Sequence, residues 1–266
     1  MEILNTFADD IAIAPLLILA AVELAAGFFD AIAGGGGLIT VPALLLAGLP
    51  PVSAIATSKL QAIFGSAAST ISFSRAGLIN WRKIYPAVIF SCAGSIAGAL
   101  AISNISPDAL KNIMPWMLIA MALYFAFSKK MTDRSAEQRL SPMVYCFTIA
   151  VAIGFYDGIF GVGTGSFFLI SLISLLGYGV TMATAHTKIL NLATIFGALC
   201  IYLPQGFVYW RVGIAMGIAS YIGSKIGSKV AISNGARIIR PMLVMVCLLM
   251  AVKILSDPSL YFYQFF

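Results

Sequence analysis

Charged residues are scarce in this 266-residue sequence. Only 10% of the residues are Asp, Glu, Lys or Arg, and 61% are hydrophobic, whereas soluble domains carry about 25% charged residues. So few ionisable side chains cannot cover the surface of a water-soluble domain of this length. Disordered chains are polar and charged, so disorder is excluded as well. The composition predicts a polytopic membrane protein whose partner is the lipid bilayer.

Residues that bind metals are also rare. The chain has one His and four Cys, namely Cys92, Cys146, Cys200 and Cys247. All four lie in apolar runs and none belongs to a C-x-x-C pair, so neither a disulfide framework nor a zinc site is predicted. We expect four small buried apolar side chains, and no metal or cofactor.

A basic surface for nucleic acid is absent too. The net charge of +6 comes from 16 basic and 10 acidic residues, but the basic residues are spread between apolar runs, which is typical of membrane loops and not of a nucleic-acid interface. The first ten residues hold three acidic residues and no Lys or Arg, the reverse of a cleavable signal peptide.

The apolar residues form ten runs. Most are about 20 residues long, which as helix spans the ~30 Å hydrocarbon core of a membrane, and they are continuous, unlike the alternating strands of a membrane barrel. Runs 38–49 and 165–177 are shorter and follow glycine clusters, so they predict broken or re-entrant helices. The runs are 11–33, 38–49, 52–74, 84–104, 109–127, 141–160, 165–177, 180–203, 210–232 and 237–256. We predict an all-α membrane protein with about eight to ten transmembrane helices.

The two halves of the chain match each other. Residues 27–36 match 154–163 at a separation of 127 positions, and Lys59 matches Lys188 at a separation of 129. We interpret the chain as two five-segment repeats. The repeats are 1–127 and 142–266, joined by a polar connector at 128–141.

Positive charge indicates how the repeats are oriented. If every run crosses once and the connector is cytoplasmic, most Lys and Arg residues lie at cytoplasmic ends, as the positive-inside rule requires. Five crossings per repeat then make the repeats inverted and place both termini outside. If the short runs merge with their predecessors, the repeats are parallel and the charge bias weakens.

Glycine clusters interrupt the helices at matching positions of the two halves. Inverted repeats with interrupted helices are typical of the central site of a secondary transporter, and helix N-termini attract anions. The alternative is a tight turn or close helix packing. The candidate substrate-binding residues here are Gly34, Gly35, Gly36, Gly37, Gly161, Gly163 and Thr164. Two G-x-x-x-G motifs, at 94–98 and 223–227, lie inside long runs and predict helix packing instead.

Ionisable residues inside the apolar runs are costly and are candidates for function. Lys59 and Lys188 are repeat partners, as are Asp30 and Asp157. The lysines are candidate ligands for a small oxyanion, and the alternative is that each forms a buried ion pair with an Asp. For that alternative we expect Lys59 to pair with Asp30.

Polar neighbours extend this candidate anion site. Ser58, Gln61, Thr187 and Asn191 lie within a turn of the two lysines. The candidates for proton coupling are Glu23, Asp30, Asp157 and His186. His186 has Thr57 as its repeat partner, so a polar packing contact is the alternative role for it.

These residues give the chain a family resemblance. Gly-Phe-Phe-Asp-Ala-Ile-Ala-Gly-Gly-Gly-Gly (27–37) and Ala-Thr-Ser-Lys-Leu-Gln (56–61) resemble the first repeat of the sulfite exporter TauE/SafE family. Gly-Phe-Tyr-Asp-Gly-Ile-Phe-Gly (154–161) and Ala-Thr-Ala-His-Thr-Lys-Ile-Leu-Asn (183–191) resemble its second. The resemblance covers nearly the whole chain and implies a multi-pass permease of the bacterial plasma membrane that exports sulfite or an organosulfonate.

Residues and resemblance both predict a secondary transporter for a small anion, working by alternating access at the repeat interface. The resemblance implies that the anion is sulfite or an organosulfur oxyanion such as a sulfonate. An anion channel is the first alternative. A membrane enzyme is the second, and the lack of a metal cluster, a Ser/His/Asp arrangement and a nucleotide motif in the sequence counts against it.

Overall fold

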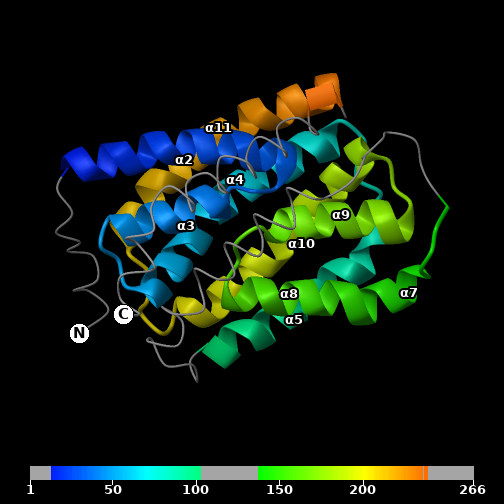
Figure 1. The fold of residues 1–266 in the computed structure, drawn as a ribbon, viewed down its shortest axis with the longest axis horizontal. Coiled ribbons are helices and arrows are strands. Elements are labelled where there is room, and N and C mark those ends of the chain that lie inside the picture. The colour runs from blue at the N-terminus through cyan, green and yellow to red at the C-terminus, as the bar shows by residue number, and fades with distance from the viewer. Residues whose placement is uncertain (1–12, 103–136, 236, 239–266) are drawn as a thin grey trace, which may run out of the picture.

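The computed structural model describes residues 13–102, 137–235 and 237–238, and over these residues it contains helices and no strand (Figure 1). The elements are α2 (Ile13–Ala33), α3 (Gly37–Leu46), α4 (Pro51–Arg75), α5 (Trp81–Ile102), α7 (Pro142–Tyr145), the π-helical segment η1 (Cys146–Ala150), α8 (Val151–Ile159), α9 (Thr164–Leu176), α10 (Val180–Tyr202) and α11 (Trp210–Asn234). The all-helical prediction is confirmed for this part of the chain. The predicted run 109–127, nearly all of the run 237–256, and most of the connector 128–141 lie outside the described residues.

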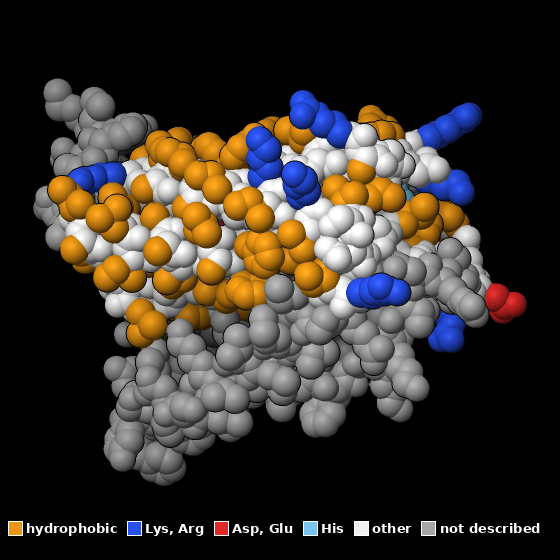
Figure 2. All heavy atoms as spheres, turned by 90° about the horizontal axis from the view of Figure 1, so that it is seen from above, with side chains coloured by type: hydrophobic (Ala, Val, Ile, Leu, Met, Phe, Trp, Pro, Cys, Tyr) orange, Lys and Arg blue, Asp and Glu red, His pale blue; other side chains and the backbone are white. Residues whose placement is uncertain are grey.

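Four of the described helices are long and apolar enough to cross a membrane: α2, α5, the continuous stretch Pro142–Ile159, and α10. Large apolar side chains point outward from them, with Leu17 65% and Phe147 56% exposed. Hydrophobic side chains spread over the face drawn in Figure 2, and the Lys and Arg side chains lie mostly toward one end. Such a surface is stable against lipid and not against water.

The two short helices are too short to cross on their own. At 1.5 Å per residue, the 10 residues of α3 span about 15 Å, and the 13 residues of α9 about 20 Å. The hydrocarbon core is ~30 Å thick. The short broken helices expected from the sequence are therefore present in the fold.

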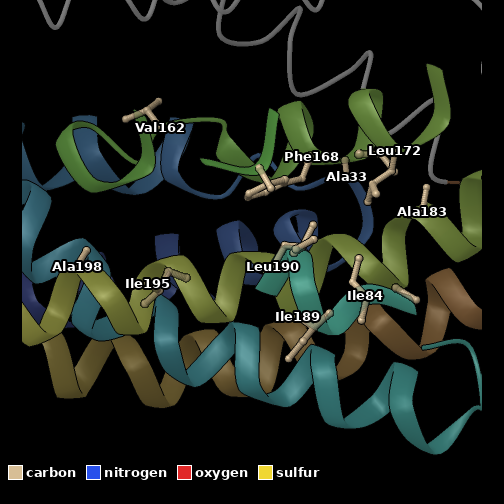
Figure 3. Packing of buried hydrophobic residues seen from close by; sticks show 14 of the residues in the cluster. Ala33, Ile84, Val162, Phe168, Leu172, Ala183, Ile189, Leu190, Ile195 and Ala198 are labelled. Atoms are coloured by element: carbon tan, nitrogen blue, oxygen red, sulfur yellow. The ribbon is translucent and has the colours of Figure 1, made fainter. Parts of the chain in front are cut away.

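The helices are arranged in three groups (Figure 1). At one side α2 packs along α11, and at the other side α5 packs along α8. Helices α3, α4, α9 and α10 lie between these two pairs. In Figure 3, Phe168 and Leu172 of α9 lie beside Ala33 at the end of α2, and Leu190 of α10 belongs to the same apolar core. The short helices are thus held in the protein interior.

Glycines allow both outer pairs to approach closely. A Cβ on Gly223 or Gly227 would collide with the backbone carbonyl oxygens of Leu24 and Phe28. A Cβ on Gly94 or Gly98 would collide with those of residues 151 and 155. The packing role predicted for the two G-x-x-x-G motifs is confirmed.

Contacts in one half recur in the other with the partners exchanged. The backbone N–H of Tyr209 donates to Thr57 Oγ1 at 3.0 Å, and the N–H of Asn80 donates to His186 Nε2 at 3.0 Å. Thr57 and His186 lie 129 positions apart in the sequence, and so do Asn80 and Tyr209. Each half therefore completes its packing with elements of the other half.

The cysteines show one error of the sequence analysis. Cys146 is buried, but Cys92 is partly exposed and Cys200 is exposed. The expectation of buried thiols is wrong for Cys200, because it lies on the outward face of α10 where an apolar run only signals lipid. Cys247 lies outside the described residues.

Gly27→Val is expected to destabilise the pair α2–α11. A Cβ at this position would lie 2.8 Å from the Ser220 carbonyl oxygen and 3.0 Å from its Cα, and backbone atoms cannot yield as a flexible side chain does. Overpacking of this kind costs about 1–3 kcal/mol. Thermal unfolding in detergent measures the loss. Ala25→Val, at an exposed position of the same helix, is the control, and an equal loss in both variants would contradict the packing account.

Candidate functional site

The chain breaks its helices at both glycine clusters. Helix α2 ends at Ala33 before α3 begins at Gly37, and α8 ends at Ile159 before α9 begins at Thr164. Gly34, Gly161 and Gly163 adopt φ angles of +79°, +71° and +75°. Glycine adopts this left-handed region without steric cost, so these residues end one helix and redirect the chain into the next.

The two breaks touch each other. A Cβ on Gly34 would lie 2.6 Å from the carbonyl carbon of Gly165, and a Cβ on Gly165 would lie 2.7 Å from the carbonyl oxygen of Gly34. Ser166 Oγ donates to the carbonyl oxygen of Ala33 at 3.0 Å. Residues more than 130 positions apart are therefore in backbone contact, which only glycine permits.

A cavity lies at this junction. It is lined by residues from α2, α4, α8, α10 and α11 as well as both breaks. They are Glu23, Asp30, Gly34, Gly36, Gly37, Ser58, Lys59, Gln61, Ala62, Gly65, Ser66, Asp157, Gly161, Gly163, Thr164, Gly165, Asn191, Ile195 and Ser220. The cavity has a volume of about 40 Å³, and roughly 10–15 Å³ is enough to hold one water molecule. The cavity suits an ion of a few heavy atoms and not a nucleotide.

Two ion pairs flank the cavity, one fully buried and one with a partly exposed Asp30, and each joins the two halves. Lys59 Nζ lies 2.7 Å from Asp157 Oδ2, and Lys188 Nζ lies 3.1 Å from Asp30 Oδ2. The expected pairing of Lys59 with Asp30 is wrong, because each lysine reaches across to the Asp of the other half. Lys59, Asp157 and Asp30 line the cavity, whereas Lys188 lies behind Asp30 and also donates to its carbonyl oxygen.

Asp30 also occupies the start of α3. The backbone N–H of Gly36 donates to Asp30 Oδ1 at 3.0 Å, so this carboxylate serves as the anion at that helix N-terminus. The corresponding end of α9, from Gly163 to Gly165, faces the cavity. The two helix N-termini therefore differ in what they offer a ligand.

Neutral polar groups complete the lining. Gln61 Oε1 and Thr164 Oγ1 are buried without a hydrogen-bonding partner among the residues that the structure describes. Buried polar groups are normally satisfied. Two unsatisfied groups in one cavity wall indicate that a ligand or water completes them.

Four of the predicted site residues do not line the cavity: Gly35, His186, Thr187 and Lys188. His186 instead accepts from the backbone N–H of Asn80, which is the polar packing contact considered as its alternative role. The wall also contains residues that the sequence analysis did not select. They are Ala62, Gly65, Ser66, Gly165, Ile195 and Ser220. Helical spacing from Ser58 would have found Ala62 and Gly65, but no pattern pointed to Ser220.

Comparison with known proteins shows which family the chain belongs to. The model of the family "Sulfite exporter TauE/SafE" matches residues 19–254. The chain belongs to this family. It is 45% identical over 251 residues to the "Probable membrane transporter protein ORF9" of a Sinorhizobium species, covering 94% of this chain and 96% of that protein. No solved structure matches the chain.

Other relatives carry similar names. A "Probable membrane transporter protein" of Haemophilus influenzae is 38% identical over 93% of this chain and 97% of its own length. The "Probable membrane transporter protein YfcA" of Escherichia coli K12 is 37% identical over 96% of this chain and 95% of its own length. The resemblance found in the sequence is confirmed, and the chain is a membrane transporter of the TauE/SafE type that works in lipid on a small molecule.

Proposed function

We propose that the chain is a secondary transporter for a small anion, sulfite or an organosulfur oxyanion such as a sulfonate. The observation that carries the proposal is the cavity at the junction of the two helix breaks, with a buried lysine in its wall. The family description, a sulfite exporter, supports the sulfur chemistry. The site is proposed to use alternating access, so that the cavity opens to one side of the membrane at a time.

The wall offers several groups suited to an oxyanion. Lys59 supplies a cation, the N-terminus of α9 supplies a positive dipole end, and Gln61 and Thr164 supply an amide and a hydroxyl donor. The Lys59 ammonium group has three N–H donors, so it can donate to the anion while it stays paired with Asp157. Lys188 lies outside the cavity and holds the wall residue Asp30.

A transport assay tests the proposal. Proteoliposomes containing the full chain are offered sulfite, thiosulfate, sulfate and methanesulfonate, each with and without a proton gradient. We expect saturable uptake of a sulfur oxyanion that responds to the gradient. Flux without saturation would indicate the channel alternative, and absence of flux for all four anions would contradict the proposal.

We further propose that the halves 1–127 and 142–266 are inverted repeats joined by the connector 128–141 in a plasma-membrane protein. The contacts that recur with exchanged partners support a two-fold relation between the halves. Inverted repeats place both termini on one side of the membrane and the connector on the other, and the positive-inside rule puts the connector in the cytoplasm.

Labelling of single cysteines tests this orientation in a variant whose four native cysteines are replaced. An impermeant maleimide added to intact spheroplasts should label positions 2 and 259 and leave position 136 unlabelled until the membrane is opened. These three positions lie outside the described residues. Labelling of position 136 in intact spheroplasts would contradict the inverted arrangement.

The proposed coupling ion is the proton. Of the four candidates named from the sequence, Glu23, Asp30 and Asp157 line the cavity. His186 lies outside the cavity wall. Asp30 and Asp157 are each held by a lysine, which leaves Glu23 in a different electrostatic position.

A further inference from the structure

Glu23 is the carboxylate of the cavity that stands apart from both ion pairs. Its side chain is 2% exposed, and none of the residues that the structure describes forms an ion pair with it. It lies on α2 seven residues before Asp30, so the two side chains share a face of the helix. An ionised carboxylate buried in this way lacks compensation.

The hydrogen-bonding geometry at Glu23 accommodates a proton on its carboxyl group. Thr40 Oγ1 lies 2.6 Å from Glu23 Oε2 and 3.1 Å from the carbonyl oxygen of Gly36. A hydroxyl group has one proton to donate, and both neighbours are oxygens. Both contacts are satisfied when Glu23 is protonated and donates to Thr40, which in turn donates to Gly36. This chain of hydrogen bonds ends at the helix break itself.

Among the elements that the structure describes, none supplies a counter-charge for Glu23. Helix α3 presents Thr40, and α11 presents the Ser220 hydroxyl, its second hydrogen-bonding partner. The charged neighbour on its own helix, Asp30, is also an acid.

The cations of the site are already engaged. Lys188 of α10 is bound to Asp30, and Lys59 of α4 is bound to the Asp157 that α8 presents to the cavity. With all five groups ionised, the site carries one negative charge in excess, which repels an anion. A proton on Glu23 removes that excess.

We propose that Glu23 is the proton-binding site that couples proton and anion in this transporter, an inference that rests on the proposed anion transport. The carboxylate takes a proton from a hydronium ion that reaches the cavity from bulk water: one O–H bond of the hydronium breaks, one O–H bond forms on Glu23, and a water molecule is left. The anion binds only to that protonated form. The positions that correspond to Glu23 and Thr40 in the second half are Ala150 and Phe167. The site is therefore single, and each bound anion requires about one proton.

Binding experiments on the purified full chain test this coupling. Methanesulfonate is the probe, because as the anion of a strong acid it carries no proton of its own. In the wild type its affinity should fall at alkaline pH by up to about tenfold per pH unit, with uptake of about one proton per anion over the same range. Glu23→Gln mimics the protonated acid, and should bind methanesulfonate with the pH dependence and the proton uptake both lost.

Glu137→Gln is the matched control, because Glu137 is an exposed carboxylate outside the cavity. It should keep the wild-type proton count. The proposal would be overturned if Glu23→Gln kept the wild-type pH dependence of methanesulfonate binding. It would also be overturned if the wild type took up no proton on binding in the pH range where its affinity for methanesulfonate falls.

A second measurement needs no substrate and separates this inference from the proposed function. Infrared spectra of the ligand-free wild type should show the carbonyl stretch of a protonated carboxyl group at neutral pH, and that band should be absent in Glu23→Gln and present in Glu137→Gln. If the Gln variant does not fold, isotope-labelled Glu in the wild type reports whether a protonated Glu is present. A wild-type spectrum without the band of a protonated Glu at neutral pH would overturn the proposal, even if the protein transports sulfite. If the band is present but the protein binds no anion, Glu23 is protonated as proposed and only the transport function is contradicted.

Discussion

Lys59→Gln is expected to abolish transport and to lower the yield of folded protein. The substitution leaves Asp157 without the ammonium group 2.7 Å away, and the two side chains are only 4% and 2% exposed. Removing one partner of a buried ion pair costs about 3–5 kcal/mol. Thermal unfolding in detergent and proteoliposome uptake measure the two losses separately.

Double variants separate the structural role of Lys59 from its role in binding. Lys59→Gln with Asp157→Asn removes both charges and should recover folding without recovering anion binding. Lys59→Gln with Asp30→Asn should recover neither, because it strands Lys188 as well as Asp157. Recovery of transport in the first double variant would show that Lys59 is only a structural partner.

Gly163→Val is expected to abolish transport while the protein still inserts into the membrane. Gly163 has φ +75° directly before α9, where a side chain costs about 1–2 kcal/mol in strain, and it lines the cavity. The valine side chain would occupy space beside the helix N-terminus where the anion is proposed to bind. Sulfite uptake and membrane content of the protein are the measurements.

Gly206→Val is the control for strain alone. Gly206 has φ +73°, and a Cβ there meets nothing within 4 Å. It should keep transport. Equal loss in both variants would mean that the glycine at position 163 serves backbone geometry only.

Gly36→Val should also abolish transport, for a different reason from the one that the sequence suggested. Gly36 has an ordinary φ of −54°, but a Cβ would lie 2.7 Å from the Cβ of Asp30. The valine displaces Asp30 from the Gly36 N–H and from Lys188. The same uptake assay, on a variant that keeps both Lys188 and Asp30 unsubstituted, measures the loss.

Much of the fold could be predicted because the apolar runs and the helices have the same physical origin. The run 180–203 predicts α10, which spans Val180–Tyr202, since a helix that crosses the hydrocarbon core must be apolar along most of its length. The glycine clusters predicted the two breaks because few other residues adopt positive φ. Both short helices follow directly from these two signals.

The pairing of side chains could not be predicted in the same way. The sequence shows that Lys59 and Asp157 lie in apolar runs, but which Asp meets which Lys depends on how α4 crosses α8, and no one-dimensional pattern encodes that crossing. Ser220 could not be predicted as a cavity residue for the same reason, because it reaches the cavity only when α11 packs against α2. Aligning the two halves shows which residues are equivalent, but only the structure shows which half supplies each partner of a contact.

The central claim is that the transported anion binds in the cavity between the two helix breaks. A single cysteine at position 62, which lines that cavity from α4, tests it most directly in a chain without its native cysteines. Maleimide labelling of this cysteine should be slowed by methanesulfonate, or by whichever non-reacting anion of the panel is transported, with half-protection at the concentration that half-saturates uptake. An unchanged labelling rate during transport would place the anion's path elsewhere and contradict the account.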